Sequence, residues 1–86
     1  MKKITMFMFE GCPYCRQARN VQQQFLDDPA YSGIEIEMID EHLHPDIADR
    51  YDYYFVPSYF YEGRKLHEGA AEQGDLQRIF DWVAMH

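Results

Sequence analysis

The chain has 86 residues, of which 47% are hydrophobic and 16% aromatic. This length and composition predict one domain, spanning residues 1–86, with enough apolar side chains for a hydrophobic core. The formal net charge of −7 and the lack of a basic cluster argue against nucleic acid and anionic membranes as partners.

The first segment, residues 2–9, reads KKITMFMF and carries a continuous apolar run that stops before Gly11. Such a run is typical of a short strand buried on both faces. It is too short for a signal peptide, and no segment of the chain is apolar over the length of a membrane span. We therefore expect a cytoplasmic protein, and we expect it to be a monomer.

A helix is predicted after this strand, because apolar residues recur there at a spacing of three or four positions. Pro13 suits the first turn of this helix, and DDPAYSG at 27–33 ends it. The next segment, IEIEMI at 34–39, alternates apolar and acidic residues, which indicates a strand with one more polar face. The apolar positions of the helix are Ala18, Val21 and Phe25.

The second half of the chain predicts a short helix, a β-hairpin and a final helix. The short helix lies within residues 40–53, and Pro45 suits its first turn. Residues 56–69 predict two strands around a turn at 62–64, and residues 72–85 predict the last helix. The inward-facing positions are Ile47, Ala48 and Tyr51 in the short helix and Leu76, Ile79, Phe80 and Val83 in the last one.

The predicted order of elements is therefore β-α-β-α-β-β-α, which defines an α/β domain. The first two strands are joined through a helix and should be parallel, whereas the hairpin is antiparallel, so we expect a four-stranded mixed sheet. Three helices should flank this sheet and cover both of its faces.

The two cysteines of the chain, Cys12 and Cys15, lie in the sequence EGCPYC at the junction of the first strand and the first helix. The first N–H groups of a helix have no partners within the helix, and the helix dipole is positive there. A thiolate at Cys12 can accept such N–H groups, which makes it reactive near neutral pH. Cys15 lies one turn further on the same side, where it can attack a mixed disulfide formed by Cys12.

Three interpretations of this cysteine pair compete. A structural disulfide is rare in the cytosol and would close too small a loop to stabilise the fold much. A zinc site needs four ligands, and His42 and His44 would have to supply two of them from a loop. A redox-active pair at a strand–helix junction is the context in which a C-x-x-C motif is expected. We favour this third interpretation and expect no metal site.

The sequence resembles the glutaredoxin and thioredoxin superfamily over nearly its whole length. CPYC at 12–15 is similar to the active site of dithiol glutaredoxins, and it lies as near to the N-terminus as in those proteins. The second half, from His44 onward, resembles thioredoxins and places Val56-Pro57 at the position of the superfamily's cis-proline. The resemblance implies a thioredoxin fold.

The resemblance also implies the residues that meet substrate. Cys12 is the implied nucleophile and Cys15 the implied resolving cysteine. The chain departs from the pattern at four places. Phe55 replaces a threonine, and Phe9, Glu10 and Gly11 stand where many relatives have a lysine or arginine. Gly69-Ala70 and Glu72 match the glutathione-binding Gly-Gly and aspartate only loosely, and Met6 replaces the buried aspartate of thioredoxins. The implied substrate-binding positions are Pro13, Tyr14, Val56, Pro57, Gly69 and Ala70.

These residues predict a thiol–disulfide oxidoreductase of the glutaredoxin type with no bound cofactor. Its expected partners are disulfide-containing proteins or mixed disulfides of glutathione, with glutathione or a flavin reductase as electron donor. Two alternatives stay open, a glutathione-independent, thioredoxin-like hydrogen donor and a non-enzymatic carrier of an iron–sulfur cluster. Phe55, the missing cation before Cys12 and the missing clear Gly-Gly predict weak binding of glutathione and a preference for protein disulfides.

Overall fold

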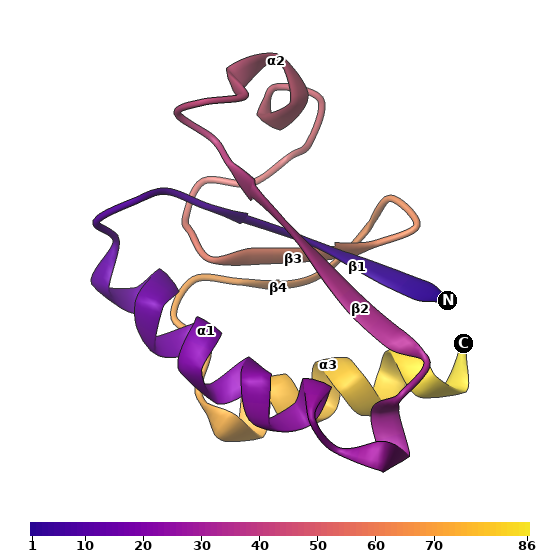
Figure 1. The fold of residues 1–86 in the computed structure, drawn as a ribbon. Helices are drawn as coiled ribbons and strands as arrows, with labels where there is room; N and C mark the ends of the chain where they lie inside the picture. The colour runs from indigo at the N-terminus through magenta and orange to yellow at the C-terminus, as the bar shows by residue number, and fades with distance from the viewer.

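A four-stranded sheet with the strand order β2-β1-β3-β4 forms the centre of the computed structural model, which describes residues 1–86 (Figure 1). β1 (Lys2–Met8) pairs in parallel with β2 (Ile34–Asp40). On its other side β1 pairs antiparallel with β3 (Ser58–Tyr61), which continues antiparallel into β4 (Arg64–Glu68). The sheet is therefore mixed, as the sequence predicts, and β1 and β3 are its inner strands.

The helices cover the two faces of the sheet unequally. α1 (Pro13–Leu26) and α3 (Gln73–Met85) lie together on one face, whereas α2 (Pro45–Ala48) lies on the other (Figure 1). One short 3-10 turn, η1 (Pro29–Tyr31), follows α1 in the segment predicted to end that helix. The predicted order of elements is confirmed. None of these helices has both the length and the apolar composition that a membrane span requires.

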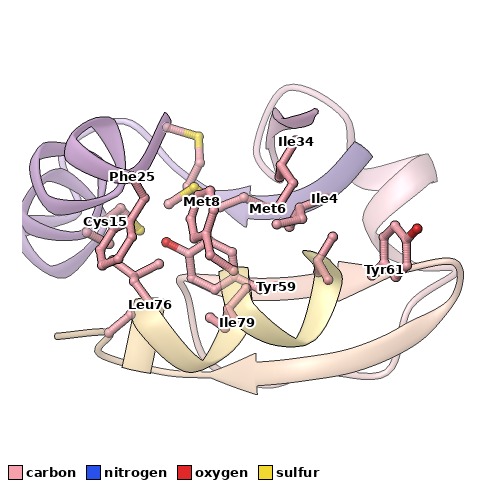
Figure 2. Close-up of a cluster of buried hydrophobic side chains, with 14 of the residues drawn as sticks. Ile4, Met6, Met8, Cys15, Phe25, Ile34, Tyr59, Tyr61, Leu76 and Ile79 are labelled. Carbon is pink, nitrogen blue, oxygen red and sulfur yellow. The ribbon is translucent and has the colours of Figure 1, made fainter. Parts of the chain in front are cut away.

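The larger of two hydrophobic clusters fills the space between the sheet and the helices α1 and α3 (Figure 2). Phe25 of α1 and Phe80 of α3 stack there, with their ring centroids 5.1 Å apart. The predicted inward positions of the last helix are all buried, and so are Ala18 and Phe25 of α1. The 15 buried members are Ile4, Met6, Met8, Cys12, Cys15, Ala18, Phe25, Ile34, Tyr59, Tyr61, Ala71, Leu76, Ile79, Phe80 and Val83.

A smaller cluster lies on the opposite face of the sheet, under α2. Its buried members are Phe7, Ala48 and Phe60. Tyr51 and Tyr53 add their rings, whose centroids lie 4.7 and 4.9 Å from that of Phe7. Tyr51 is predicted to continue the stripe of the short helix; the helix instead ends at Ala48, four residues from its start, and Tyr51 reaches the core from the following loop. α2 therefore covers only part of this face.

The burial of the first two strands agrees with their sequence patterns. Met6 and Phe7 of β1 are both fully buried, although they point to opposite faces, so β1 has a core on each side. In β2, Ile34 is buried while Glu35 and Glu37 are exposed, as predicted for a strand with one more polar face, but Met38 on the predicted apolar face is 50% exposed.

The stacked pair Phe25–Phe80 leads to a prediction about stability. Phe80→Ala should lower the free energy of unfolding by about 3–5 kcal/mol, because a fully buried ring is lost and a cavity remains. Urea denaturation followed by circular dichroism measures this difference. Met85→Ala on the same helix is the control, because Met85 is 82% exposed and its loss should change stability by less than about 0.5 kcal/mol. Equal effects of the two changes would contradict the assigned core.

Candidate active site

Cys12 is the residue at which the chain passes from the sheet into α1. Its backbone is extended, and its Sγ accepts a hydrogen bond from the N–H of Cys15 at 3.2 Å. Pro13 follows Cys12 as the first helical residue. Gly11 precedes Cys12 and has φ of +91°, a conformation that other residues rarely adopt. The sulfur of Cys12 thus replaces a missing helical acceptor and faces the positive end of the helix dipole.

Cys15 lies one turn deeper and is only 1% exposed. Burial raises the pKa of its thiol to about 12, and its hydrogen bond with Cys12 acts in the same direction. Both cysteines are thiols in this structure. Both sulfurs belong to the buried cluster, but their surroundings differ. Cys12 Sγ accepts a backbone N–H at the start of α1, whereas Cys15 lies one turn deeper in the core.

The carboxylate of Asp40 ties two loops together beside Cys12. Asp40 is the last residue of β2, and its side chain accepts the N–H groups of Glu10 at 3.2 Å, His42 at 2.8 Å and Leu43 at 3.3 Å. Glu10 belongs to the loop between β1 and Cys12, so this contact fixes that loop against the end of β2. Asp40 is absent from the residues expected from the sequence.

On the other side of the site lies the loop that carries Val56 and Pro57. The peptide bond between them is cis, as the resemblance implies. Pro57 O accepts the N–H of Gly69 at 2.8 Å, and Gly69 has φ of +93°. The predicted positions Pro57 and Gly69 are thus brought together, with Ala70 next to them. Val56 packs against the cluster that contains both cysteines.

Glu68, at the end of β4, holds this loop in place. Its carboxylate accepts hydrogen bonds from Lys65 Nζ at 2.7 Å and from the N–H groups of Tyr54 at 2.5 Å and Phe55 at 2.9 Å. These contacts, that with Lys65 first, lower the pKa of Glu68 to about 2. The side chains of Tyr54 and Phe55 are left pointing outward, 85% and 69% exposed. Glu68 was also not expected from the sequence.

The other residues that the sequence suggests for the site lie at the surface or do not contact one another. Tyr14 is 58% exposed, and Glu10 is exposed as well. His42 stacks on Phe9 with ring centroids 4.6 Å apart, and no three His, Cys, Asp or Glu side chains form a group that could hold a metal ion. The largest groove, about 750 Å³, lies over the sheet face that α2 leaves partly bare, and neither cysteine lines it. Both cysteines are nearly buried, Cys12 with 5% and Cys15 with 1% of its surface exposed.

Residues 2–81 match the family described as the thioredoxin domain. This chain belongs to the thioredoxin domain family. A thioredoxin of Malassezia sympodialis has a similar structure, with a TM-score of 0.67 and 16% sequence identity over 95% of this chain and 74% of that one. No curated protein matches the sequence significantly.

Membership of this family settles the fold and the general type of chemistry. The chain has the thioredoxin fold that its sequence resembles, with a four-stranded mixed sheet and three helices. It is a redox domain of the thiol–disulfide oxidoreductase type. In this thioredoxin domain, Cys12 and Cys15 occupy the start of α1 at the edge where β1 ends.

The carboxylate of Glu68 leads to a prediction about pH. Its pKa in the folded protein is about 2, against an ordinary value of 4.5, so its contribution to stability is complete above about pH 4.5 and is lost as the pH falls toward 2. Glu68→Gln should therefore be less stable than the natural protein at pH 6, and the difference should shrink between pH 4.5 and 2. Urea denaturation across this range measures it.

A matched control for Glu68→Gln is Glu35→Gln. Glu35 is exposed and its side chain makes no hydrogen bond or ion pair, so this variant should follow the natural protein at every pH. A stability difference for Glu68→Gln that is the same at pH 6 and pH 2 would show that the carboxylate does not hold the loop.

Proposed function

We propose that this protein reduces disulfide bonds, with Cys12 as the nucleophile and Cys15 as the resolving cysteine. The observation that carries the proposal is the placement of Cys12 Sγ at the start of α1, where it accepts the N–H of Cys15 at 3.2 Å. The unpaired N–H groups and the positive dipole end at the start of a helix stabilise negative charge that develops on an atom placed there. Cys15, buried one turn away, is well placed to meet a mixed disulfide formed on Cys12.

The proposed reaction has two steps. The Cys12 thiolate attacks one sulfur of a substrate disulfide, so that a mixed disulfide forms and the first substrate thiolate leaves and takes up a proton. The Cys15 sulfur then attacks Cys12 Sγ, the bond to the substrate breaks, and the second substrate thiol leaves with the proton lost by Cys15. Two electrons have passed to the substrate, and Cys12 and Cys15 are joined by a disulfide. A thiol donor, either glutathione or the dithiol of a reductase, then reduces the protein again.

The backbone of Val56 supports a binding role for the loop before Pro57. Glu68 takes up the N–H groups of Tyr54 and Phe55, and Gly69 donates to Pro57 O. The N–H and C=O of Val56 have no hydrogen-bond partner in the protein. An extended substrate segment beside Cys12 can pair with them as one strand pairs with another.

The surface around the site favours a protein or peptide substrate. Met8 pairs with Asp40 and Phe7 with Ser58, so the loops that follow β1 and β2 and the loop that precedes β3 meet at one edge of the sheet. Large apolar side chains on these loops and on the first turn of α1 are exposed. They are Tyr14, Leu43, Tyr54 and Phe55, between 58% and 85% exposed.

Glutathione fits this surface less well. It is an anionic tripeptide, and such a ligand gains most from charge-assisted hydrogen bonds to cations. The carboxylates of Glu10, Asp40 and Glu68 lie near Cys12 and the Val56 loop. Of the nearby cations, Lys65 is paired with Glu68, and Arg16 follows Cys15 in α1. We therefore expect protein disulfides to be the preferred substrates and glutathione to serve only as an electron donor.

Substitution of each cysteine tests the roles assigned to them. With dithiothreitol as reductant, Cys12→Ser should lose all reduction of insulin disulfides, because no nucleophile remains. Cys15→Ser should accumulate a mixed disulfide with the substrate, visible by mass spectrometry, because the resolving sulfur is missing. A mixed disulfide that accumulates in Cys12→Ser instead, with Cys15→Ser fully active, would reverse the assignment.

Substitution of Phe55 tests the preference for protein substrates. Phe55→Thr should lower kcat/KM for insulin by about threefold to tenfold, because an exposed ring that becomes buried on binding is lost. Turnover of a glutathione mixed disulfide should not fall. Met85→Ala serves as the control, because Met85 is also an exposed apolar residue, 82% exposed against 69% for Phe55, but lies at the end of α3. Rapid turnover of the glutathione mixed disulfide without turnover of insulin would contradict the preference.

A further inference from the structure

The core beneath the cysteines contains one polar pair that the mechanism above does not use. Tyr59 of β3 is fully buried, and its hydroxyl donates to Gln22 Oε1 at 2.7 Å. Gln22 is 3% exposed and lies on the buried face of α1, two turns after Cys15. Within the larger hydrophobic cluster, only Tyr59 and Tyr61 have a side-chain oxygen. A polar pair in such apolar surroundings calls for a physical explanation.

The hydroxyl of Tyr59 lies on the Cys15 side of this core. In Figure 2 the Tyr59 oxygen points from β3 toward the labelled Cys15, whereas Tyr61 lies at the opposite end of the cluster. Burial raises the pKa of Tyr59, and the nearby charge of the Cys15 thiolate raises it further. The phenol therefore keeps its proton at neutral pH, and it can act as a hydrogen-bond donor but not as a base.

A hydrogen-bond donor near Cys15 would stabilise its thiolate, which its surroundings disfavour. Its burial disfavours the thiolate, and Cys12 disfavours it further through a hydrogen bond and through charge. The groups that favour the thiolate are the backbone of Phe9 and the more distant charge of Arg19. The position across from Tyr59 on β1 is Met6, so β1 offers no polar side chain there.

We propose that Tyr59 donates a hydrogen bond to Cys15 Sγ when this sulfur becomes negative, and that Gln22 holds the hydroxyl in place until then. The inference rests on the proposed function, in which Cys15 attacks the mixed disulfide on Cys12. In that step the Cys15–Cys12 bond forms, the bond to the substrate breaks, and the leaving substrate thiolate takes up the proton that Cys15 has lost. Rotation of the Tyr59 O–H from Gln22 Oε1 to the sulfur stabilises the attacking thiolate.

The reaction of the reduced protein with dithiobis(nitrobenzoate) separates the two cysteines. Attack by Cys12 releases one coloured thiolate at a rate that depends on reagent concentration. Attack by Cys15 on the mixed disulfide releases the second at a rate that does not. Stopped-flow absorbance records both phases across a range of pH. Absence of the first phase in the natural protein would refute the proposed function, whereas the inference about Tyr59 concerns the second phase alone.

Tyr59→Phe removes the hydroxyl and keeps the ring. Its first phase should match that of the natural protein, and its second phase should be about tenfold slower or more at neutral pH, the effect of losing one hydrogen bond to a charged group. The rise of the second phase with pH should move upward by about one unit or more. Tyr61→Phe, which makes the same change at the far end of the same cluster, should alter neither phase.

Gln22→Met provides an independent variant, because it removes the acceptor that competes with Cys15 for the hydroxyl. Its second phase should rise at lower pH than in the natural protein. An unchanged second phase in Tyr59→Phe, or a slowing that Tyr61→Phe shares and that leaves the pH profile in place, would overturn the proposal and reduce the pair to a link between β3 and α1. A second-phase pH profile that does not move in Gln22→Met would also overturn the proposal. If Tyr59→Phe does not fold, Gln22→Met alone tests whether Tyr59 acts on Cys15.

Discussion

The burial of β1 on both faces is the constraint on which the rest of the molecule depends. Met6 points into the larger cluster and Phe7 into the smaller one, and neither is exposed. Because β2 and β3 pair with β1 on either side, their loops meet where β1 ends. The chain can continue from this point only through the turn at Gly11, which delivers Cys12 to the start of α1. The position of the Cys12 sulfur is thus a consequence of how the sheet is assembled.

Two carboxylates complete this arrangement from opposite sides. Asp40 fixes the loop that leads to Cys12, and Glu68 fixes the loop that leads to Pro57. Both do so by accepting backbone N–H groups that belong to no helix or strand. Such N–H groups need a hydrogen-bond partner wherever a loop is held in one conformation. Glu68 also leaves the polar backbone of Val56 as the free part of its loop. The cysteine pair therefore lies between two loops, each of which is held at one point by a carboxylate.

The sequence alone predicts the order of elements, the mixed sheet and the place of the cysteines, because these follow from local periodicity and from the CPYC motif. It overestimates α2, since Tyr51 reaches the core from a loop whose course depends on Phe7 and Phe60. The sequence does not predict the roles of Asp40, Glu68 and the pair Gln22–Tyr59, and the reason is the same for all of them. The contacts Glu10–Asp40, Phe55–Glu68 and Tyr59–Gln22 join residues that are 13 or more positions apart in the sequence, so only the folded chain reveals them.

The unequal cover of the two sheet faces has a consequence for how the site moves. The face under α1 and α3 rests on 15 buried residues, whereas the face under α2 rests on three. Segments with few buried contacts open at lower free energy than those within a large core. The cysteines are anchored in the large cluster, and the segment from α2 to Phe55 in the small one. We therefore expect the segment from α2 to Phe55 to open locally at lower free energy than α1, whose packing in the large cluster keeps the two sulfurs in place.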